Sequence, residues 1–204
     1  MRLSCLVLLL HGLFCAARAA DHPAILPAAP AELLPCLPSP PEGWKLITSR
    51  GENLLSGWLA TEVVREYEFQ PPAKDPGAPP LPPKKTFVRI SDTGYWQEGK
   101  GTSANAKPPK GAKKGGFQGY PMVQSQHEGK MRSMITVKDR FIIVVETENQ
   151  TPRETEEWLK FINYDLLKRL PDDGPTVLPQ PVKMIVVDEI NPAQSRTYSS
   201  YLNR

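Results

Sequence analysis

The chain has 204 residues, of which 40% are hydrophobic and 23% are charged, and this is enough for one packed domain with extensions. The formal net charge is only +3, so the overall charge does not indicate a nucleic acid or another polyanion as a partner. Proline is enriched, with 23 residues. The prolines are clustered along the chain, and they therefore indicate linkers and loops rather than the composition of the core.

The N-terminus has the pattern of a secretory signal peptide. Arg2 gives a short positive region, an apolar stretch covers residues 3–17, and Ala17 and Ala19 form a small-x-small cleavage site. The apolar stretch is shorter than the roughly 20 residues that a membrane-spanning helix needs. We therefore expect residues 1–20 to be removed on export to a periplasmic or extracellular location, with an uncleaved anchor as the alternative.

Removal of residues 1–20 would leave Cys36 as the last cysteine of the chain. A lone cysteine cannot form a disulfide within the chain, so we expect the core to stabilise the domain, with an intermolecular disulfide as the alternative. Residues 21–41, which contain Cys36, are rich in proline and alanine and carry few charges. This composition predicts an extended, disordered spacer in front of a domain over residues 42–170.

Alternating and apolar runs predict the strands of this domain. Residues 63–69 place Val63, Tyr67 and Phe69 on one face and glutamates on the other, which is typical of a half-buried strand. Residues 50–53, Arg-Gly-Glu-Asn, predict a turn instead. Further strands are expected over shorter apolar runs, at residues 84–92, 120–126, 131–137 and 141–146.

The end of the domain contains the most core-forming sequence. The unbroken apolar run 141–145 indicates a strand that is covered on both faces and is therefore central in the sheet. Thr151 and Glu154 form a T-x-x-E capping box, which predicts the start of a helix. Three apolar residues at helical spacing would pack this helix against the sheet, namely Trp158, Phe161 and Ile162.

Insertions and an extension complete the chain. Residues 71–83 are dense in proline, and residues 98–116 are rich in glycine and lysine, so both predict loops that interrupt the domain. In the extension 171–204, the β-prone run 182–188 predicts an additional strand that pairs within the chain or with a partner, followed by a loosely ordered polar tail. The predicted fold class is α+β, with a mainly antiparallel sheet of about five strands covered by one principal C-terminal helix.

No constellation in the sequence supports catalysis, a cofactor or a metal. Residues 94–102 resemble a phosphate-binding loop, but Gly101 occupies the place of the Mg²⁺-binding hydroxyl. Histidine is scarce, and no His, Cys, Asp or Glu cluster has the spacing of metal ligands. Ser125 and His127 would share one face of a strand, and a hydrolase that uses them is the enzymatic alternative, although neither lies in a nucleophile elbow.

The candidate binding residues are lysines of the second insertion. They could capture an anionic lipid or an acidic wall polymer, and they are Lys100, Lys107, Lys110, Lys113 and Lys114. The insertion lacks interleaved aromatic residues for base stacking, so no specific nucleic acid is expected as a partner. The alternative is a solvated loop that only keeps the protein soluble.

Four segments carry a resemblance: the Pro-Glu-Gly-Trp turn at 41–44, the strand 63–69, the apolar run 141–146 and the helix 158–170. This layout resembles small exported bacterial domains of unknown function and the Mog1/PsbP-type α+β sandwich, in which helices cover an antiparallel sheet. The resemblance implies an accessory, non-catalytic role in an exported compartment. We therefore expect an exported, non-enzymatic binding or accessory module with a protein partner, and electrostatic attachment through the lysines is an alternative.

Overall fold

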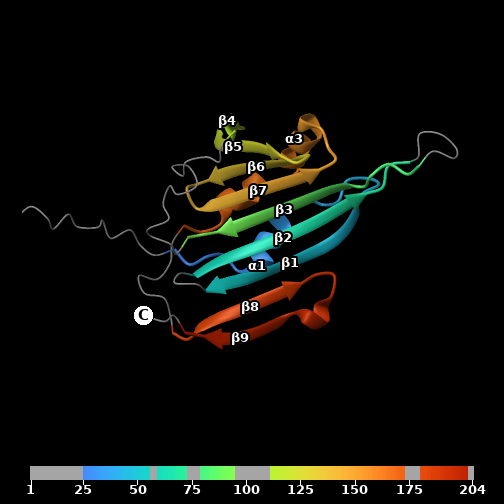
Figure 1. The fold of residues 1–204 in the computed structure, drawn as a ribbon. Helices are drawn as coiled ribbons and strands as arrows, with labels where there is room; N and C mark the ends of the chain where they lie inside the picture. The colour runs from blue at the N-terminus through green and yellow to red at the C-terminus, as the bar shows by residue number, and fades with distance from the viewer. Residues whose placement is uncertain (1–24, 56–58, 73–78, 95–110, 173–179, 202–204) are drawn as a thin grey trace, which may run out of the picture.

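The computed structural model describes residues 25–55, 59–72, 79–94, 111–172 and 180–201. In these ranges the chain forms one antiparallel sheet of nine strands in the order β4-β5-β6-β7-β3-β2-β1-β8-β9 (Figure 1). The prediction of about five strands covered by one principal C-terminal helix is therefore wrong. The signal peptide expected over residues 1–20 lies outside the described residues. No helix within the described ranges is long and apolar enough to cross a membrane.

The strands vary in length, and the helices are short. The strands are β1 (Lys45–Leu55), β2 (Leu59–Phe69), β3 (Lys84–Asp92), β4 (Lys113–Phe117), β5 (Tyr120–His127), β6 (Lys130–Val137), β7 (Phe141–Glu148), β8 (Val182–Asp188) and β9 (Arg196–Ser200). The helices are α1 (Pro30–Leu33), α3 (Pro152–Lys160) and α4 (Tyr164–Arg169), with the 3₁₀ turns η1 (Leu34–Cys36) and η2 (Pro192–Gln194).

The sheet is assembled from three consecutive parts of the chain. The strands β1, β2 and β3 pair in sequence, and the chain then crosses to the edge strand β4 and returns through β5 and β6 to β7, which pairs with β3. The apolar strand β7 is thus an interior strand, as its sequence predicts, although the described helices cover one of its faces and not both. After α3 and α4, β8 pairs with the remaining edge of β1, and β9 forms the outer edge.

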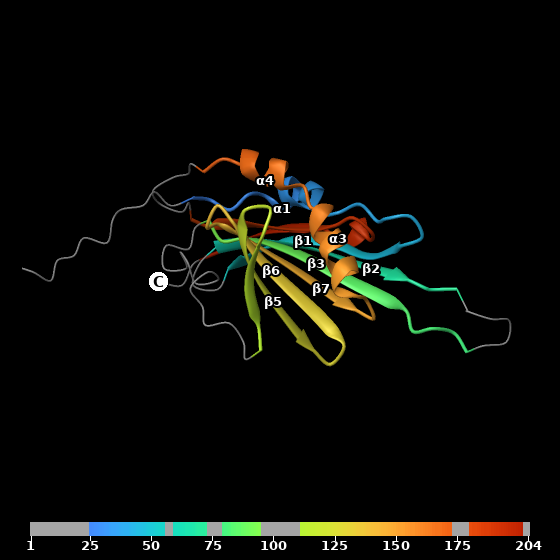
Figure 2. The same ribbon diagram turned by 90° about the horizontal axis from the view of Figure 1, so that it is seen from above.

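The helices and the core lie on one face of the sheet (Figure 2). Alternate residues of the central strands point to this face and pack beneath α3 and α4. The buried residues from strands and helices include Val63, Tyr67, Val88, Ile90, Ile135, Val137, Phe141, Ile143, Val145, Trp158, Leu159 and Leu167. The aromatic rings of Tyr67 and Trp158 lie 4.7 Å apart and join the sheet to α3.

The described part of the segment before β1, which begins at residue 25, also belongs to the core, and this corrects the prediction of a disordered spacer for residues 25–41. Leu33 and Cys36 are fully buried in the main hydrophobic cluster, at 0% exposure. Pro30 opens α1, because proline suits the first position of a helix, where no backbone hydrogen bond is lost. Burial raises the pKa of Cys36 to about 11, so the thiolate needed for an intermolecular disulfide is scarce at neutral pH.

The expected turn at residues 50–53 is instead part of β1. A Cβ on Gly51 would lie 2.9 Å from Cβ of Pro30 and 2.8 Å from Cγ1 of Val63. Glycine therefore lets α1 approach the strand closely, and it does not mark a change of chain direction here.

Two short strands occupy places where loops were expected. All but the last residue of β4 lies within the predicted insertion 98–116, and β9 lies within the predicted polar tail. Both are edge strands with mostly exposed residues, so neither has the apolar alternation that identifies a strand. Parts of the insertions 71–83 and 98–116 lie outside the described residues.

The hairpin β8–β9 joins the sheet through a short contact. Its register with β1 is limited to Arg50 opposite Asp188, Gly51 opposite Val187, and Glu52 opposite Val186. Beyond these pairs, Oε2 of Glu189 accepts a hydrogen bond from Nη2 of Arg65 at 2.8 Å, and the Glu189 amide donates to the Ser49 carbonyl at 2.8 Å. The strand predicted at 182–188 therefore pairs within the chain.

The start of α3 confirms the capping box. The Glu154 amide donates to Oγ1 of Thr151 at 3.3 Å, and the Thr151 amide donates to Oε2 of Glu154 at 2.8 Å. We expect Thr151→Ala to lower the free energy of unfolding by about 1 kcal/mol, measured by urea denaturation, because an N-terminal amide loses its acceptor. Glu156→Ala on the exposed side of α3 is the control, and an equal loss in both variants would contradict the prediction.

Candidate functional site

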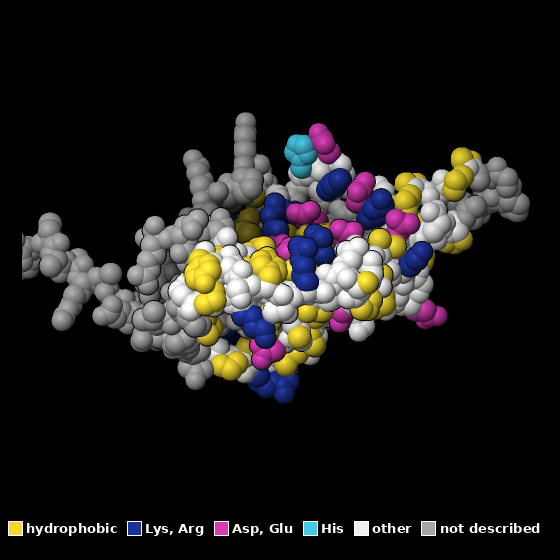
Figure 3. Space-filling model, turned by 90° about the horizontal axis from the view of Figure 1, so that it is seen from below, with side chains coloured by type: hydrophobic (Ala, Val, Ile, Leu, Met, Phe, Trp, Pro, Cys, Tyr) yellow, Lys and Arg dark blue, Asp and Glu magenta, His cyan; other side chains and the backbone are white. Residues whose placement is uncertain are grey.

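The face of the sheet opposite α1, α3 and α4, called here the open face, is the candidate functional surface. Paired residues of antiparallel strands point to the same face, so the strand register assigns each side chain to one side. Seen from below, which is the side of β8 and β9 in Figure 1, acidic and basic side chains are interspersed with hydrophobic ones and do not gather into a patch of one sign (Figure 3). The strand register also places both acidic and basic residues on the open face, which makes that face compatible with solvent.

One row across the open face alternates in charge. It runs over β2, β3, β7 and β6 through Glu68, Lys85, Glu148 and Lys130. Nζ of Lys85 lies 3.9 Å from Oε2 of Glu68, and Nζ of Lys130 lies 3.6 Å from Oε2 of Glu148. These four side chains are between 41% and 63% exposed, and such pairs contribute at most about 1 kcal/mol to stability.

The next row places an aromatic ring between two carboxylates. Phe87 of β3 is paired with Glu66 of β2 on one side and with Glu146 of β7 on the other. Oε1 of Glu146 lies 3.3 Å from Nε of Arg132, the next residue in the row. Glu66 accepts a hydrogen bond from Oγ1 of Thr48 at 3.1 Å, but it has no ion-pair partner within the described part of the chain.

These two rows line a groove of about 360 Å³, called here the Phe87 groove. Its lining comes from β1, β2, β3, β6 and β7 and comprises Ile47, Glu66, Tyr67, Glu68, Lys85, Thr86, Phe87, Lys130, Glu146, Thr147 and Glu148. Four carboxylates and two ammonium groups surround the half-buried ring of Phe87. The groove thus combines an apolar floor with an excess of negative charge.

A second hollow of about 390 Å³ lies between β1 and the β8–β9 hairpin. Its charged lining is balanced, with Arg50 and Arg196 against Glu52 and Asp188. The Asp188 carboxylate already accepts hydrogen bonds from the backbone amides of Ile190 and Asn191, at 3.0 and 2.7 Å. This hollow therefore favours neither sign of ligand charge as clearly as the Phe87 groove does.

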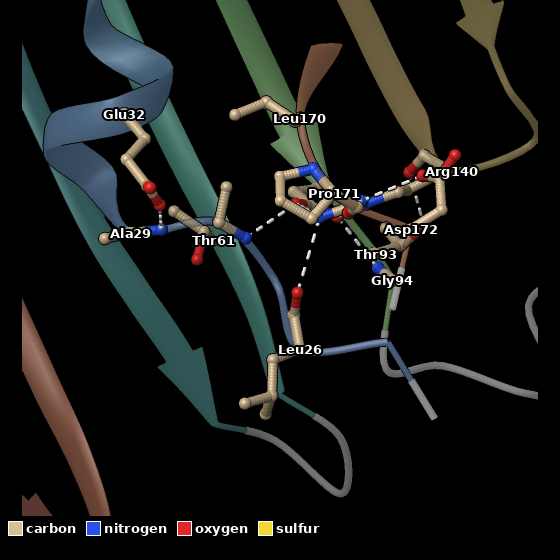
Figure 4. A network of polar contacts seen from close by, with 12 residues as sticks. Leu26, Ala29, Glu32, Thr61, Thr93, Gly94, Arg140, Leu170, Pro171 and Asp172 are labelled. Carbon is tan, nitrogen blue, oxygen red and sulfur yellow. Dashed lines mark hydrogen bonds and ion pairs between the residues drawn. The ribbon is translucent and has the colours of Figure 1, made fainter. Parts of the chain in front are cut away.

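A buried ion pair lies at the other end of the strands (Figure 4). Nε and Nη2 of Arg140 donate to the two carboxylate oxygens of Asp92 at 2.8 and 2.7 Å, and these side chains are 4% and 0% exposed. The backbone amides of Ala28 and Gly94 also donate to Asp92, and Nη2 of Arg140 donates to the Leu26 carbonyl. Since these protein groups satisfy the pair, we interpret it as structural.

Asp172 extends this pair to the surface and makes stability depend on pH. Partial burial raises its pKa, but the hydrogen bonds from Lys138 and Arg140 together outweigh this and hold the pKa of Asp172 below its ordinary value. A carboxyl whose folded pKa is lowered stabilises the protein above its unfolded pKa, and this stability is lost as pH falls through the folded pKa. The contribution of Asp172 to the free energy of unfolding is therefore present at neutral pH and is lost at acid pH.

We expect Asp172→Asn to be less stable than the natural protein at neutral pH. The difference should shrink below about pH 4, where the aspartate of the unfolded chain becomes protonated. Urea denaturation over a pH series measures this difference. Asp165→Asn, which changes an exposed carboxylate on α4, is the control, and a difference that stays constant with pH would contradict the assignment.

Among the residues that the structure describes, the candidate lysines do not form a cluster. Lys100, Lys107 and Lys110 lie outside the described residues. Lys113 and Lys114 are exposed neighbours on the edge strand β4, so their side chains point to opposite faces of the sheet. Lysines on an edge strand also discourage pairing with strands of other molecules, and this gives them a structural role.

Ser125 and His127 lie at the end of β5 and show no catalytic arrangement in the described part of the chain. The His127 side chain is 83% exposed, its Nδ1 lies 3.7 Å from Oε2 of Glu128, and no hydrogen bond joins it to Ser125. Among the described residues, no group of three or more His, Cys, Asp or Glu side chains could hold a metal ion.

Comparison with known proteins found no match to this chain among protein-family models, curated proteins or solved structures. The resemblance to exported Mog1/PsbP-type domains therefore stays a prediction from the residue pattern.

Proposed function

We propose that the protein is a non-enzymatic binding module that holds its ligand on the open face, in the Phe87 groove. The observation that supports this proposal is the position of Phe87. Its ring lies on the face without described helices, and it belongs to neither hydrophobic cluster of the described residues. Apolar surface that converges with charged groups in a concavity is characteristic of ligand sites.

Solubility alone does not account for this arrangement. A one-sided antiparallel sheet needs polar side chains on its solvated face, and the charge-alternating row meets that need. The half-buried ring of Phe87 in the next row leaves part of its apolar surface exposed and belongs to neither hydrophobic cluster of the described residues. A binding site that uses both the ring and the neighbouring carboxylates would explain why Phe87 lies on the open face. Export, expected from residues 1–20, would put this module in a periplasmic or extracellular compartment with a protein partner.

Binding of labelled short peptides to the full chain tests the proposal. The panel contains alternating Gly-Lys, Gly-Glu, Gly-Tyr and Gly-Ser peptides. Fluorescence anisotropy measures the affinity of each peptide, and changes in the NMR chemical shifts of the backbone amides locate the binding site. We expect at least one peptide to bind and to shift amides of β2, β3 and β7. Phe87→Ser should weaken this binding. Phe161→Ser should not, because Phe161, the residue that follows α3, is 51% exposed on the helical side and does not pack on the sheet, although its spacing predicts this.

The absence of binding by every peptide in the panel would contradict the proposal. Shifts confined to α3, α4 and the N-terminal segment would contradict it as well, because they would place the ligand on the helical side.

A further inference from the structure

We infer that the Phe87 groove binds the ammonium or guanidinium group of a lysine or arginine in an extended basic peptide. This inference rests on the proposed function and specifies the partner of the same site. It is drawn from the order of side chains across the strands, from the charge balance of the groove, and from the shape of β1 beside it.

The order of side chains provides the binding geometry. Directly paired residues of antiparallel strands have Cβ atoms about 4.5–5.5 Å apart, so the carboxylates of Glu66 and Glu146 flank the Phe87 ring closely. A cation above this ring would meet the negative face of the π system and a carboxylate on either side. Within the described part of the chain, no lysine or arginine lies over this ring.

Among the described residues, the ion pairs of the groove leave the carboxylate of Glu66 without a cationic partner. Lys85 and Lys130 face Glu68 and Glu148 in the charge-alternating row, and Arg132 faces Glu146. Within the ranges that the structure describes, the Glu66 carboxylate accepts a hydrogen bond from the Thr48 hydroxyl and pairs with no cation. An incoming cation would complete the pairing of the groove, whereas an anion would have to approach an excess of carboxylates.

A bulge in β1 adds apolar surface that suits a long side chain. The register between β1 and β2 shifts between Leu46 and Thr48, and the extra residue is Ile47. Ile47 is 42% exposed and lines the groove together with Phe87. The methylene stem of a lysine or arginine could lie along this apolar surface while its charged end reaches Glu66. A small inorganic cation would not use Ile47.

The test uses the full chain, a labelled alternating Gly-Lys peptide and a matched Gly-Glu peptide, with anisotropy measured over a salt series. We expect only the Gly-Lys peptide to bind, with an affinity that falls as salt increases. Glu66→Gln should weaken binding about 5-fold, and Phe87→Leu about 3-fold, as expected for partly exposed charge and cation–π contacts. Both changed side chains lie outside the hydrophobic clusters, and circular dichroism confirms that the variants fold.

Glu156→Gln is the matched control, because it removes the same charge from the exposed side of α3. Equal weakening by Glu66→Gln and Glu156→Gln would overturn the inference, since the attraction would then come from net charge. Binding of the Gly-Glu peptide alone, with shifts on the open face, would overturn it and leave the proposed function intact. Spermidine that binds as tightly as the peptide and shifts the same amides would overturn the assignment to a peptide.

Discussion

Replacing Arg140 with methionine is expected to lower the free energy of unfolding by about 3–5 kcal/mol. The substitution leaves the Asp92 carboxylate at 0% exposure without its cation, and removing one partner of a buried pair is far more costly than removing the pair. It also deprives the Leu26 and Pro171 carbonyls of a donor. Urea denaturation, with the midpoint and slope fitted separately, measures the loss.

Arg132→Met is the matched control for this prediction. Arg132 is 50% exposed, and its ion pair with Glu146 should contribute at most about 1 kcal/mol. Similar losses in the two variants would show that Asp92 is solvated in solution. The double variant Arg140→Met/Asp92→Asn should recover part of the loss, because the asparagine oxygen can still accept from the amides of Ala28 and Gly94.

The substitution Leu33→Ala is expected to lower the free energy of unfolding by about 2–5 kcal/mol. Leu33 lies in α1 at 0% exposure within the main hydrophobic cluster, so its truncation leaves a cavity between the N-terminal segment and the sheet. A residue in a disordered spacer would show no effect. Urea denaturation therefore separates the packed segment of the structure from the spacer that composition predicts.

Leu54→Ala in β1 serves as the control for Leu33→Ala, because Leu54 is 38% exposed. Its effect should stay within about 0.5 kcal/mol, which is usual for surface substitutions. A loss for Leu33→Ala no larger than this would mean that α1 does not pack on the sheet in solution.

The sequence predicts the parts of this fold that have strong local patterns. Alternating and continuous apolar runs identify β2, β3 and β5 to β8, and the capping box of Thr151 and Glu154 identifies the start of α3. The elements that the sequence does not predict have local patterns that are typical of other structures. Gly51 suggests a turn although it permits a close approach to Pro30, and the prolines around Leu33 suggest a spacer although Pro30 opens a helix.

The site depends on information that local patterns do not contain. Glu66, Phe87 and Glu146 come from three separate regions of the sequence and become neighbours only because β7 pairs with β3 in one particular register. Alternation alone could place each of them on a solvated strand face, but not beside one another. Conversely, Lys113 and Lys114 are adjacent in sequence, yet the pleat of β4 points them to opposite faces.

The attachment of β8 to β1 has a consequence for how the chain is made. β1 is synthesised early and obtains β2 as a neighbour at once, but its other edge is covered only when β8 has emerged, more than a hundred residues later. Closing such a long loop is slow compared with forming a hairpin. The nascent protein therefore passes through a period in which β1 has an unprotected backbone edge, and aggregation during synthesis should depend on how quickly the last hairpin docks.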